Sequence, residues 1–172
     1  LLDTKASWRN KDNAIKLLQL NNFSDQIEIV AYCLMPNHFH FLLKQVEPTS
    51  MSLFMKSLCT RYAMYFNKKY KWVGGPFQDV YKAVRVTTEE QLLYLTRYIH
   101  RNPIAKKHIL DLASQGSSLR SWSYSSYLEY SGKRFTRWVV TDDILKYFSG
   151  LGFLSYESFV GDLDYEEKEV QS

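Results

Sequence analysis

Residues 26–44 have the pattern of a β-hairpin, and this hairpin constrains the fold more than any other part of the chain. Apolar residues alternate with other residues from 27 to 33, which is the period of a strand with one apolar face. The turn Met35-Pro36-Asn37 follows, where proline cannot donate to a ladder and asparagine tolerates turn geometry. A second strand is expected over residues 38–44, so the two strands pair as neighbours.

The rest of the pattern predicts three helices and one further strand. Helical periodicity runs over residues 11–20, 48–69 and 88–101, with Thr87 or Thr88 as the cap of the last helix, and a strand is expected over residues 77–86. One more strand before Leu1 would complete the order βαββαβ. The sequence therefore predicts an α+β fold, a ferredoxin-like antiparallel sheet with helices on one face. Because the chain begins at Leu1 in mid-pattern, we expect that its first strand is missing from this fragment.

A chain of 172 residues suits one domain with a small appendage. We expect the main domain over residues 1–110 and a C-terminal helical extension over residues 111–172. Short helical pieces are predicted near residues 121–130 and 142–148, with a linker at 116–118, and the extension ends in an acidic tail.

Charge is distributed unevenly along the chain. The net charge is only +4, but residues 51–110 hold eleven Lys and Arg against three acids, a net +8, whereas residues 153–172 carry −5. The aromatic share is 16%, and many of these rings lie among the basic residues of the middle. Such a combination is typical of a nucleic-acid groove. A solvated basic face explains the charge pattern alone equally well.

His38 and His40 form the sharpest local feature. On a strand, residues two apart point to the same face, so the two imidazoles project side by side. Phe39 and Phe41 are then expected to enter the core on the other face. Two neutral imidazoles held in this way suit a divalent metal. The alternative is a chance pair of surface histidines.

A second group of polar residues shares one face of the helix predicted over 88–101. Tyr94, Tyr98 and Asn102 are four residues apart, away from the apolar stripe. Tyrosine is a possible covalent nucleophile, and an asparagine oxygen is able to complete a metal site with the two histidines. The alternative is a tyrosine packed on the sheet.

Five motifs follow one another along the chain: residues 33–43 (CLMPNHFHFLL), 61–70 (RYAMYFNKKY), 75–82 (GPFQDVYK), 97–105 (RYIHRNPIA) and 122–127 (WSYSSY). Together they resemble the single-tyrosine, His-hydrophobe-His (HUH) transposases, and most closely the REP-associated tyrosine transposases of bacteria. The resemblance covers roughly residues 1–148.

This resemblance implies a role for each of the four residues. Tyr98 would be the catalytic nucleophile, and His38, His40 and Asn102 would hold Mg²⁺ or Mn²⁺. The implied reaction cleaves and rejoins single-stranded DNA through a 5′-phosphotyrosine, with a DNA hairpin from a palindromic repeat as substrate. No nucleotide cofactor is required, because the covalent link conserves the bond energy.

Basic residues of the middle are expected to contact DNA phosphates. They are Arg61, Lys68, Lys69, Lys82, Arg85, Arg97 and Arg101. We expect a cytoplasmic monomer with no membrane partner, since two cysteines are too few for a disulfide scaffold. Two other functions remain open: a non-catalytic binder of structured single-stranded DNA or RNA, and a metal hydrolase of small molecules that uses the histidines.

Overall fold

The computed structural model describes residues 22–104, 122–150 and 155–161, which divide between two compact units. The first unit contains residues 22–27 and 46–81, and the second contains the described residues of 28–45 and 82–161. The helix predicted over residues 11–20 and the linker at 116–118 lie outside the described residues. None of the described helices has the length and hydrophobicity of a membrane span.

The first unit is built on α3 (Ser50–Tyr70), which confirms the helix predicted over residues 48–69. Its last turn ends at Lys71, a residue in the left-handed region with φ 53°. The N-terminal half of the helix packs through Phe54 against Phe23, whose ring centroid lies 5.7 Å away in an edge-to-face contact. Few α3 residues are buried, so most of the helix surface faces solvent in the described structure.

The strand predicted over residues 77–86 is wrong. These residues form no ladder and have no regular secondary structure. Side chains instead of backbone bonds hold the start of the segment, because the Phe77 ring contacts Tyr62 at 5.6 Å and Tyr81 Oη lies 3.2 Å from Ser52 Oγ. The loose apolar alternation that suggested a strand arises from residues such as Val84, which is 77% exposed.

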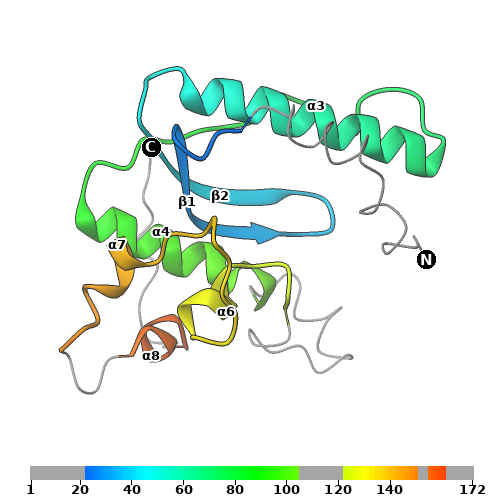
Figure 1. The fold of residues 1–172 in the computed structure, drawn as a ribbon. Coiled ribbons are helices and arrows are strands. Elements are labelled where there is room, and N and C mark those ends of the chain that lie inside the picture. Colours follow the sequence, from blue (N-terminus) through cyan, green and yellow to red (C-terminus); the bar gives the residue numbers. More distant parts are fainter. Residues whose placement is uncertain (1–21, 105–121, 151–154, 162–172) are drawn as a thin grey trace, which may run out of the picture. The chain divides into compact units, whose positions relative to one another are not determined.

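The second unit is organised around the predicted hairpin, formed by β1 (Ile27–Leu34) and β2 (Phe39–Gln45) (Figure 1). The Met35 N–H donates to His38 O at 2.9 Å and closes the turn. These are the two strands of the described sheet, so the α+β class is confirmed, while the larger ferredoxin-like sheet stays a prediction.

The outer edge of β1 is covered by segments from the C-terminal part of the chain. Leu34 N–H donates to Tyr124 O at 2.8 Å, and Val140 N–H donates to Ile29 O at 2.9 Å. Isolated bridges join the same two segments to β1. These bonds satisfy backbone groups that an edge strand would otherwise expose.

Helix α4 (Glu89–Arg101) packs against β2 and begins at Thr88. The Thr88 side chain accepts a hydrogen bond from Gln91 N–H at 3.1 Å, which confirms the cap and satisfies one free amide of the first turn. The helix ends at Arg101 and continues into a short 3-10 turn, η1 (Asn102–Ile104), where proline was expected to end it.

Three short helices of the C-terminal part complete the core of the second unit. They are α6 (Tyr127–Tyr130), α7 (Asp142–Leu145) and α8 (Tyr156–Gly161). Tyr127, Ile144 and Val160 are buried in one cluster with Val30 of β1 and Ile99 of α4. This cluster contains residues from both sides of residue 110, and the division expected there stays a prediction. Short helices of this kind cannot bury their apolar residues alone, so they pack on the hairpin and α4 (Figure 1).

His100 lies at the centre of this core and is fully buried. Its Nδ1 lies 2.6 Å from Tyr156 Oη, and its Nε2 lies 2.7 Å from Ser126 Oγ. One proton arrangement satisfies every group: Tyr156 O–H donates to Nδ1, Nε2–H donates to Ser126 Oγ, and Ser126 O–H donates to Tyr32 O at 3.3 Å. This arrangement requires a neutral imidazole.

Burial lowers the pKa of His100 to about 3. An unfolded chain takes up a proton at this residue below about pH 6.5, whereas the folded chain does not. The stability contributed by neutral His100 is therefore complete above that pH and is lost as the pH falls toward 3. We predict that the free energy of unfolding drops by about 2 kcal/mol between pH 7 and pH 5 on account of His100.

Urea unfolding of the wild type and of His100→Gln at both pH values tests this. The variant should be less stable at pH 7 but should lose less stability on acidification. Equal losses in the two proteins would contradict the assignment, and His38→Gln, an exposed histidine, is the matched control.

Candidate active site

Three of the four residues predicted for catalysis meet in the second unit. The ring centroids of His38 and His40 lie 4.9 Å apart at 88°, so the two imidazoles are neighbours on one face of the hairpin, as predicted. Across from them, the Tyr98 ring lies 5.6 Å from the His40 ring at 82°. Tyr98 is 41% exposed, so part of the residue is open to solvent.

The tyrosine face of α4 is also as predicted. The Tyr94 and Tyr98 rings lie 6.4 Å apart and nearly parallel at 19°, which is the arrangement of residues four apart on a helix. Asn102 follows one turn later, at the junction of α4 with η1, and is only 8% exposed. Tyr98 and Asn102 therefore lie on the same face, one helical turn apart.

His40 has an unsatisfied ring nitrogen. Its Nε2 is buried and has no hydrogen-bond partner among the described residues. Burial lowers the pKa of His40, and neighbouring His38 lowers it further. The imidazole is therefore neutral at pH 7, with one buried nitrogen that a metal or a ligand would satisfy.

His38 is held by its neighbour in the turn. Its Nδ1 lies 2.7 Å from Asn37 Oδ1, and since an amide oxygen only accepts, Nδ1 carries the proton. The Nε2 lone pair is then free to act as a ligand. A hydrogen bond to the remote ring nitrogen is the usual way in which proteins orient a metal-binding histidine.

The chemistry of these donors fits a divalent cation. His38 and His40 offer two imidazole nitrogens side by side, and Asn102 carries an amide oxygen one turn beyond Tyr98. Across the part of the chain that the structure describes, no group of three His, Cys, Asp or Glu side chains is able to hold a metal. Among the described residues, the other ligands of a cation at the histidine pair would be amide, hydroxyl, water or phosphate oxygens, which Mg²⁺ and Mn²⁺ accept.

The histidine face of β2, and not the phenylalanine face, belongs to the core. Leu42 shares the face of His38 and His40 and joins the buried cluster, because α4 packs on this side. Phe39 and Phe41 contact each other at 5.2 Å and are only half-buried. The prediction that these two rings enter the core is wrong.

Arg97 is not on a DNA-facing surface. It is 2% exposed, its Nε donates to Phe159 O of α8 at 2.8 Å, and its guanidinium lies 5.9 Å from the Phe159 ring. Arg101 donates more weakly to Val160 O at 3.4 Å. These arginines bind the C-terminal carbonyls of α8, so the expected phosphate contact of Arg97 is corrected to a structural one.

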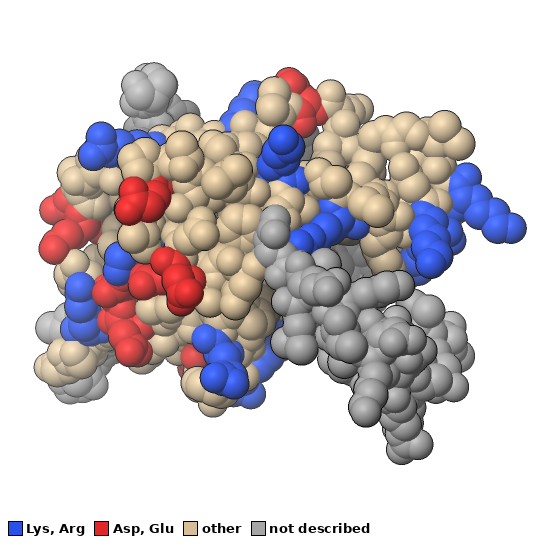
Figure 2. All heavy atoms as spheres, turned by 45° about the horizontal axis from the view of Figure 1, so that its top comes forward, with Lys and Arg blue, Asp and Glu red and all other residues tan. Residues whose placement is uncertain are grey.

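The other predicted DNA contacts are exposed and are divided between the two units. Arg61, Lys68 and Lys69 lie on α3 of the first unit, and Lys82 and Arg85 lie in the second. Lysine and arginine side chains project into solvent on the face drawn in Figure 2. The Lys69 ammonium lies 5.4 Å from the Tyr65 ring and 5.2 Å from the Tyr70 ring, so cations and exposed aromatics are interleaved on α3.

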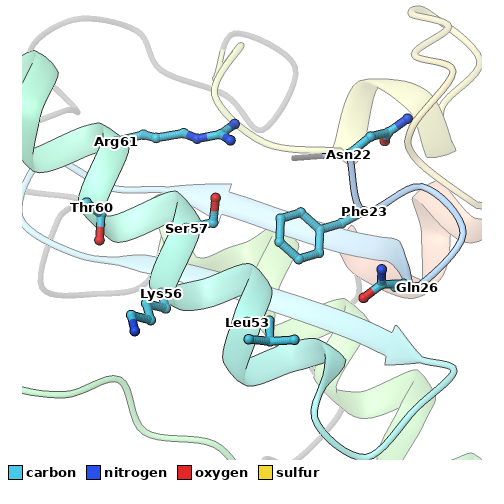
Figure 3. A pocket seen from close by; sticks show the side chains of 8 residues that line it. All are labelled: Asn22, Phe23, Gln26, Leu53, Lys56, Ser57, Thr60 and Arg61. Atoms are coloured by element: carbon cyan, nitrogen blue, oxygen red, sulfur yellow. The ribbon is translucent and has the colours of Figure 1, made fainter. Parts of the chain in front are cut away.

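A cavity of about 630 Å³ opens in the first unit, beside α3 (Figure 3). Its wall combines an aromatic ring, two amides, two hydroxyls and two cations. The lining residues are Asn22, Phe23, Gln26, Leu53, Lys56, Ser57, Thr60 and Arg61. Of these, sequence reasoning singled out only Arg61, because the loop residues carry no motif and meet α3 only after folding.

Comparison with known proteins decides the family. The model of the family described as "Transposase IS200 like" matches residues 8–102, more than half of the chain. The chain belongs to the IS200-like transposases. The matched range includes the histidine pair, Tyr98 and Asn102, and it ends before the three short helices. No curated protein and no solved structure matched the chain.

Membership of the IS200-like transposases implies an enzyme that cleaves and rejoins DNA. Sequence reasoning found the residues that meet at the hairpin but missed the buried groups behind them, His100 and Ser126. Ser126 belongs to the motif at residues 122–127, and membership of that motif was the signal that could have indicated its importance. Nothing in the sequence indicates that His100, which lies between Arg97 and Arg101, is buried.

The position of Arg97 leads to a test. We predict that Arg97→Met lowers the free energy of unfolding by about 2 kcal/mol, because a buried bond from a charged donor is lost. The salt dependence of DNA binding should not change, since Arg97 contacts no phosphate. Arg61→Met, the exposed control, should leave stability unchanged and reduce the slope of log affinity against log salt. A reduced slope for Arg97→Met would contradict this interpretation.

Proposed function

We propose that this transposase cleaves and rejoins single-stranded DNA hairpins through a covalent 5′-phosphotyrosine at Tyr98. The observation that carries the proposal is the contact of the half-exposed Tyr98 ring with His40, next to His38. A nucleophile and two metal-binding imidazoles are the parts that phosphodiester transfer requires. The resemblance to REP-associated tyrosine transposases supports short palindromic repeats as the substrate.

The residues that would hold Mg²⁺ or Mn²⁺ are His38, His40 and Asn102. The buried Nε2 of His40, which has no partner among the described residues, supports this assignment. The hydrogen bond from His38 Nδ1 to Asn37 Oδ1 supports it too, because it leaves the lone pair on His38 Nε2. When bound, the cation polarises the scissile phosphate and stabilises the charge that develops on it.

Tyr98 supplies the nucleophile. Its Oη forms a bond to phosphorus while the bond from phosphorus to the 3′-oxygen breaks, which leaves a 5′-phosphotyrosine and a free 3′-hydroxyl. The phenol proton is lost and the leaving oxygen gains one, so the step is balanced without hydrolysis of a nucleotide. In the reverse step, the 3′-hydroxyl of another strand attacks the phosphotyrosine and restores Tyr98.

The exposed surface of the first unit supports DNA binding. Phosphate contacts are assigned to Arg61, Lys68 and Lys69 on α3, and Lys82 and Arg85 add charge in the second unit. Tyr62, Tyr65, Tyr70 and Trp72 are each 45–57% exposed, which leaves ring faces available for unpaired bases. We assign one copy of the chain to one hairpin.

Tyr98→Phe tests the nucleophile. Wild-type protein, Mn²⁺ and labelled single-stranded hairpins with randomised flanks should yield an adduct that survives denaturing electrophoresis. Tyr98→Phe should form at least about 1,000-fold less adduct than the wild type, since no other group replaces the phenol oxygen. Tyr94→Phe, the neighbouring ring on α4, is the control and should retain it.

Two outcomes would contradict the proposal. An undiminished adduct in Tyr98→Phe would place the nucleophile elsewhere. A wild-type protein that binds the hairpins but forms no adduct in any divalent metal would be a non-catalytic binder of structured DNA.

His40→Ala tests the metal site. We predict that the variant remains folded, since His40 forms no hydrogen bond through Nε2, but needs at least about tenfold more Mn²⁺ for half-maximal adduct formation. Chelation should abolish the adduct in the wild type and leave hairpin binding in place. An unchanged Mn²⁺ requirement in His40→Ala would remove His40 from the site.

A further inference from the structure

The cavity beside α3 takes no part in the proposed strand transfer. All of its lining residues belong to the first unit, whereas the histidine pair and Tyr98 belong to the second. One wall is formed by residues 22–26 and the other by residues 53–61 of α3 (Figure 3). Its volume of about 630 Å³ is typical of pockets that enclose a small molecule. We call it the α3 cavity.

The α3 cavity has a positive charge. Lys56 and Arg61 line it together, and none of its lining residues is acidic. Neither cation forms an ion pair with another described residue. Figure 3 shows Arg61 extending from α3 toward the wall formed by residues 22–26. Since lysine and arginine side chains without acidic partners bind phosphate and carboxylate groups, the ligand that suits this cavity is an anion.

Two hydroxyl groups, those of Ser57 and Thr60, lie on the same wall, each next in sequence to one of the two cations. A serine or threonine inside a helix often donates to the carbonyl four residues back, as Thr96 of α4 does to Leu92 O at 2.8 Å. Neither Ser57 nor Thr60 does so, and neither side chain has another hydrogen bond among the described residues. Both hydroxyls are therefore available to donate to a bound phosphate.

The opposite wall carries groups that fit a nucleobase. The Phe23 ring points toward α3 in Figure 3, and it is half-buried by its edge-to-face contact with Phe54. The Gln26 amide is half-buried too and forms no side-chain hydrogen bond with a described residue, so it offers a donor and an acceptor side by side. An aromatic ring packs on any base, and a glutamine amide matches the N6 and N7 edge of adenine.

We propose that the α3 cavity binds a free mononucleotide such as adenosine monophosphate (AMP). The phosphate is held by the two cations and the two hydroxyls of α3, and the base contacts Phe23 and Gln26. One ring and one pair of cations match one base and one phosphate, which favours a single nucleotide over a strand. No bond is made or broken, so the nucleotide is an effector and not a cofactor or a substrate.

Arg61 links this cavity to hairpin binding. The proposed function assigns Arg61 to a DNA phosphate, and the same guanidinium lines the α3 cavity. A guanidinium that holds the phosphate of a mononucleotide is not available to DNA, so the nucleotide and the hairpin compete. This competition rests on the proposed function, whereas binding of the nucleotide itself does not.

Calorimetric titration of the whole chain tests the nucleotide site. The ligands are AMP and its two halves, adenosine and inorganic phosphate, in the presence of a chelator so that the histidine pair holds no cation. AMP should bind one site at least about tenfold more tightly than either half, because only AMP engages both walls.

Lys56→Met and Thr60→Val should each weaken AMP binding about tenfold, the effect of one lost hydrogen bond to a charged group. Lys71→Met and Thr49→Val are the matched controls and should not change it, since both residues are exposed and lie outside the cavity. Thermal unfolding should be the same in all four variants, because the replaced side chains are exposed.

Gln26→Leu separates the two walls. It should weaken AMP binding and leave the affinity for inorganic phosphate unchanged, since the amide faces the base and not the phosphate. Equal affinities of the wild type for AMP and phosphate would overturn the proposal. Unchanged AMP binding in both Lys56→Met and Thr60→Val would do so too.

Competition with a fluorescent DNA hairpin, measured by anisotropy, tests the link through Arg61. Saturating AMP should lower the affinity of the wild type for the hairpin, and unaltered hairpin binding would remove the link. If AMP does not bind and Thr60→Val weakens only the hairpin, the cavity holds part of a DNA strand and the proposal is wrong. Tyr98→Phe should bind AMP normally, so loss of the adduct and loss of the nucleotide site are distinguishable.

Discussion

The hydroxyl of Ser126 is the point on which the second unit depends. It accepts the Tyr32 N–H at 2.8 Å, lies 2.7 Å from His100 Nε2, and is completely buried. One oxygen thus joins β1, α4 and the C-terminal segment. Because each partner is itself buried, the loss of this group would leave several polar atoms without hydrogen bonds. The position of α4, and with it that of Tyr98, follows from this junction.

α4 is also attached to α8. Arg97 binds the carbonyl of Phe159, and Tyr156 bonds to His100, so two successive turns of α4 are attached to one short helix. Tyr98 lies between these anchored residues and yet is half-exposed. Tyr98 therefore stands on a fixed support, while its own side chain is left half-exposed, as the proposed nucleophile requires. Preorganisation of this kind places a reacting group without an ordering cost at the moment of reaction.

Local patterns in the sequence predicted the parts of the fold that local chemistry determines. The hairpin follows from alternation and a proline turn, and the start of α4 follows from Thr88 and Gln91. The histidine pair follows from the period of a strand. Phe39 and Phe41 were misplaced because periodicity separates two faces but does not say which one a helix will cover. The prediction of a strand over residues 77–86 was wrong for a related reason, because apolar alternation makes a ladder only where a second strand is available to pair with it.

Contacts across long stretches of sequence determine the rest. Tyr32 and Ser126 are 94 residues apart, and Tyr130 donates to the carbonyl of Val30 across 100 residues. Such contacts form only when both ends of the chain are present. During synthesis, the hairpin, the histidines and Tyr98 all leave the ribosome before the residues that fix them. A nascent chain therefore carries the histidine pair and Tyr98 but lacks their support until translation has passed Val160.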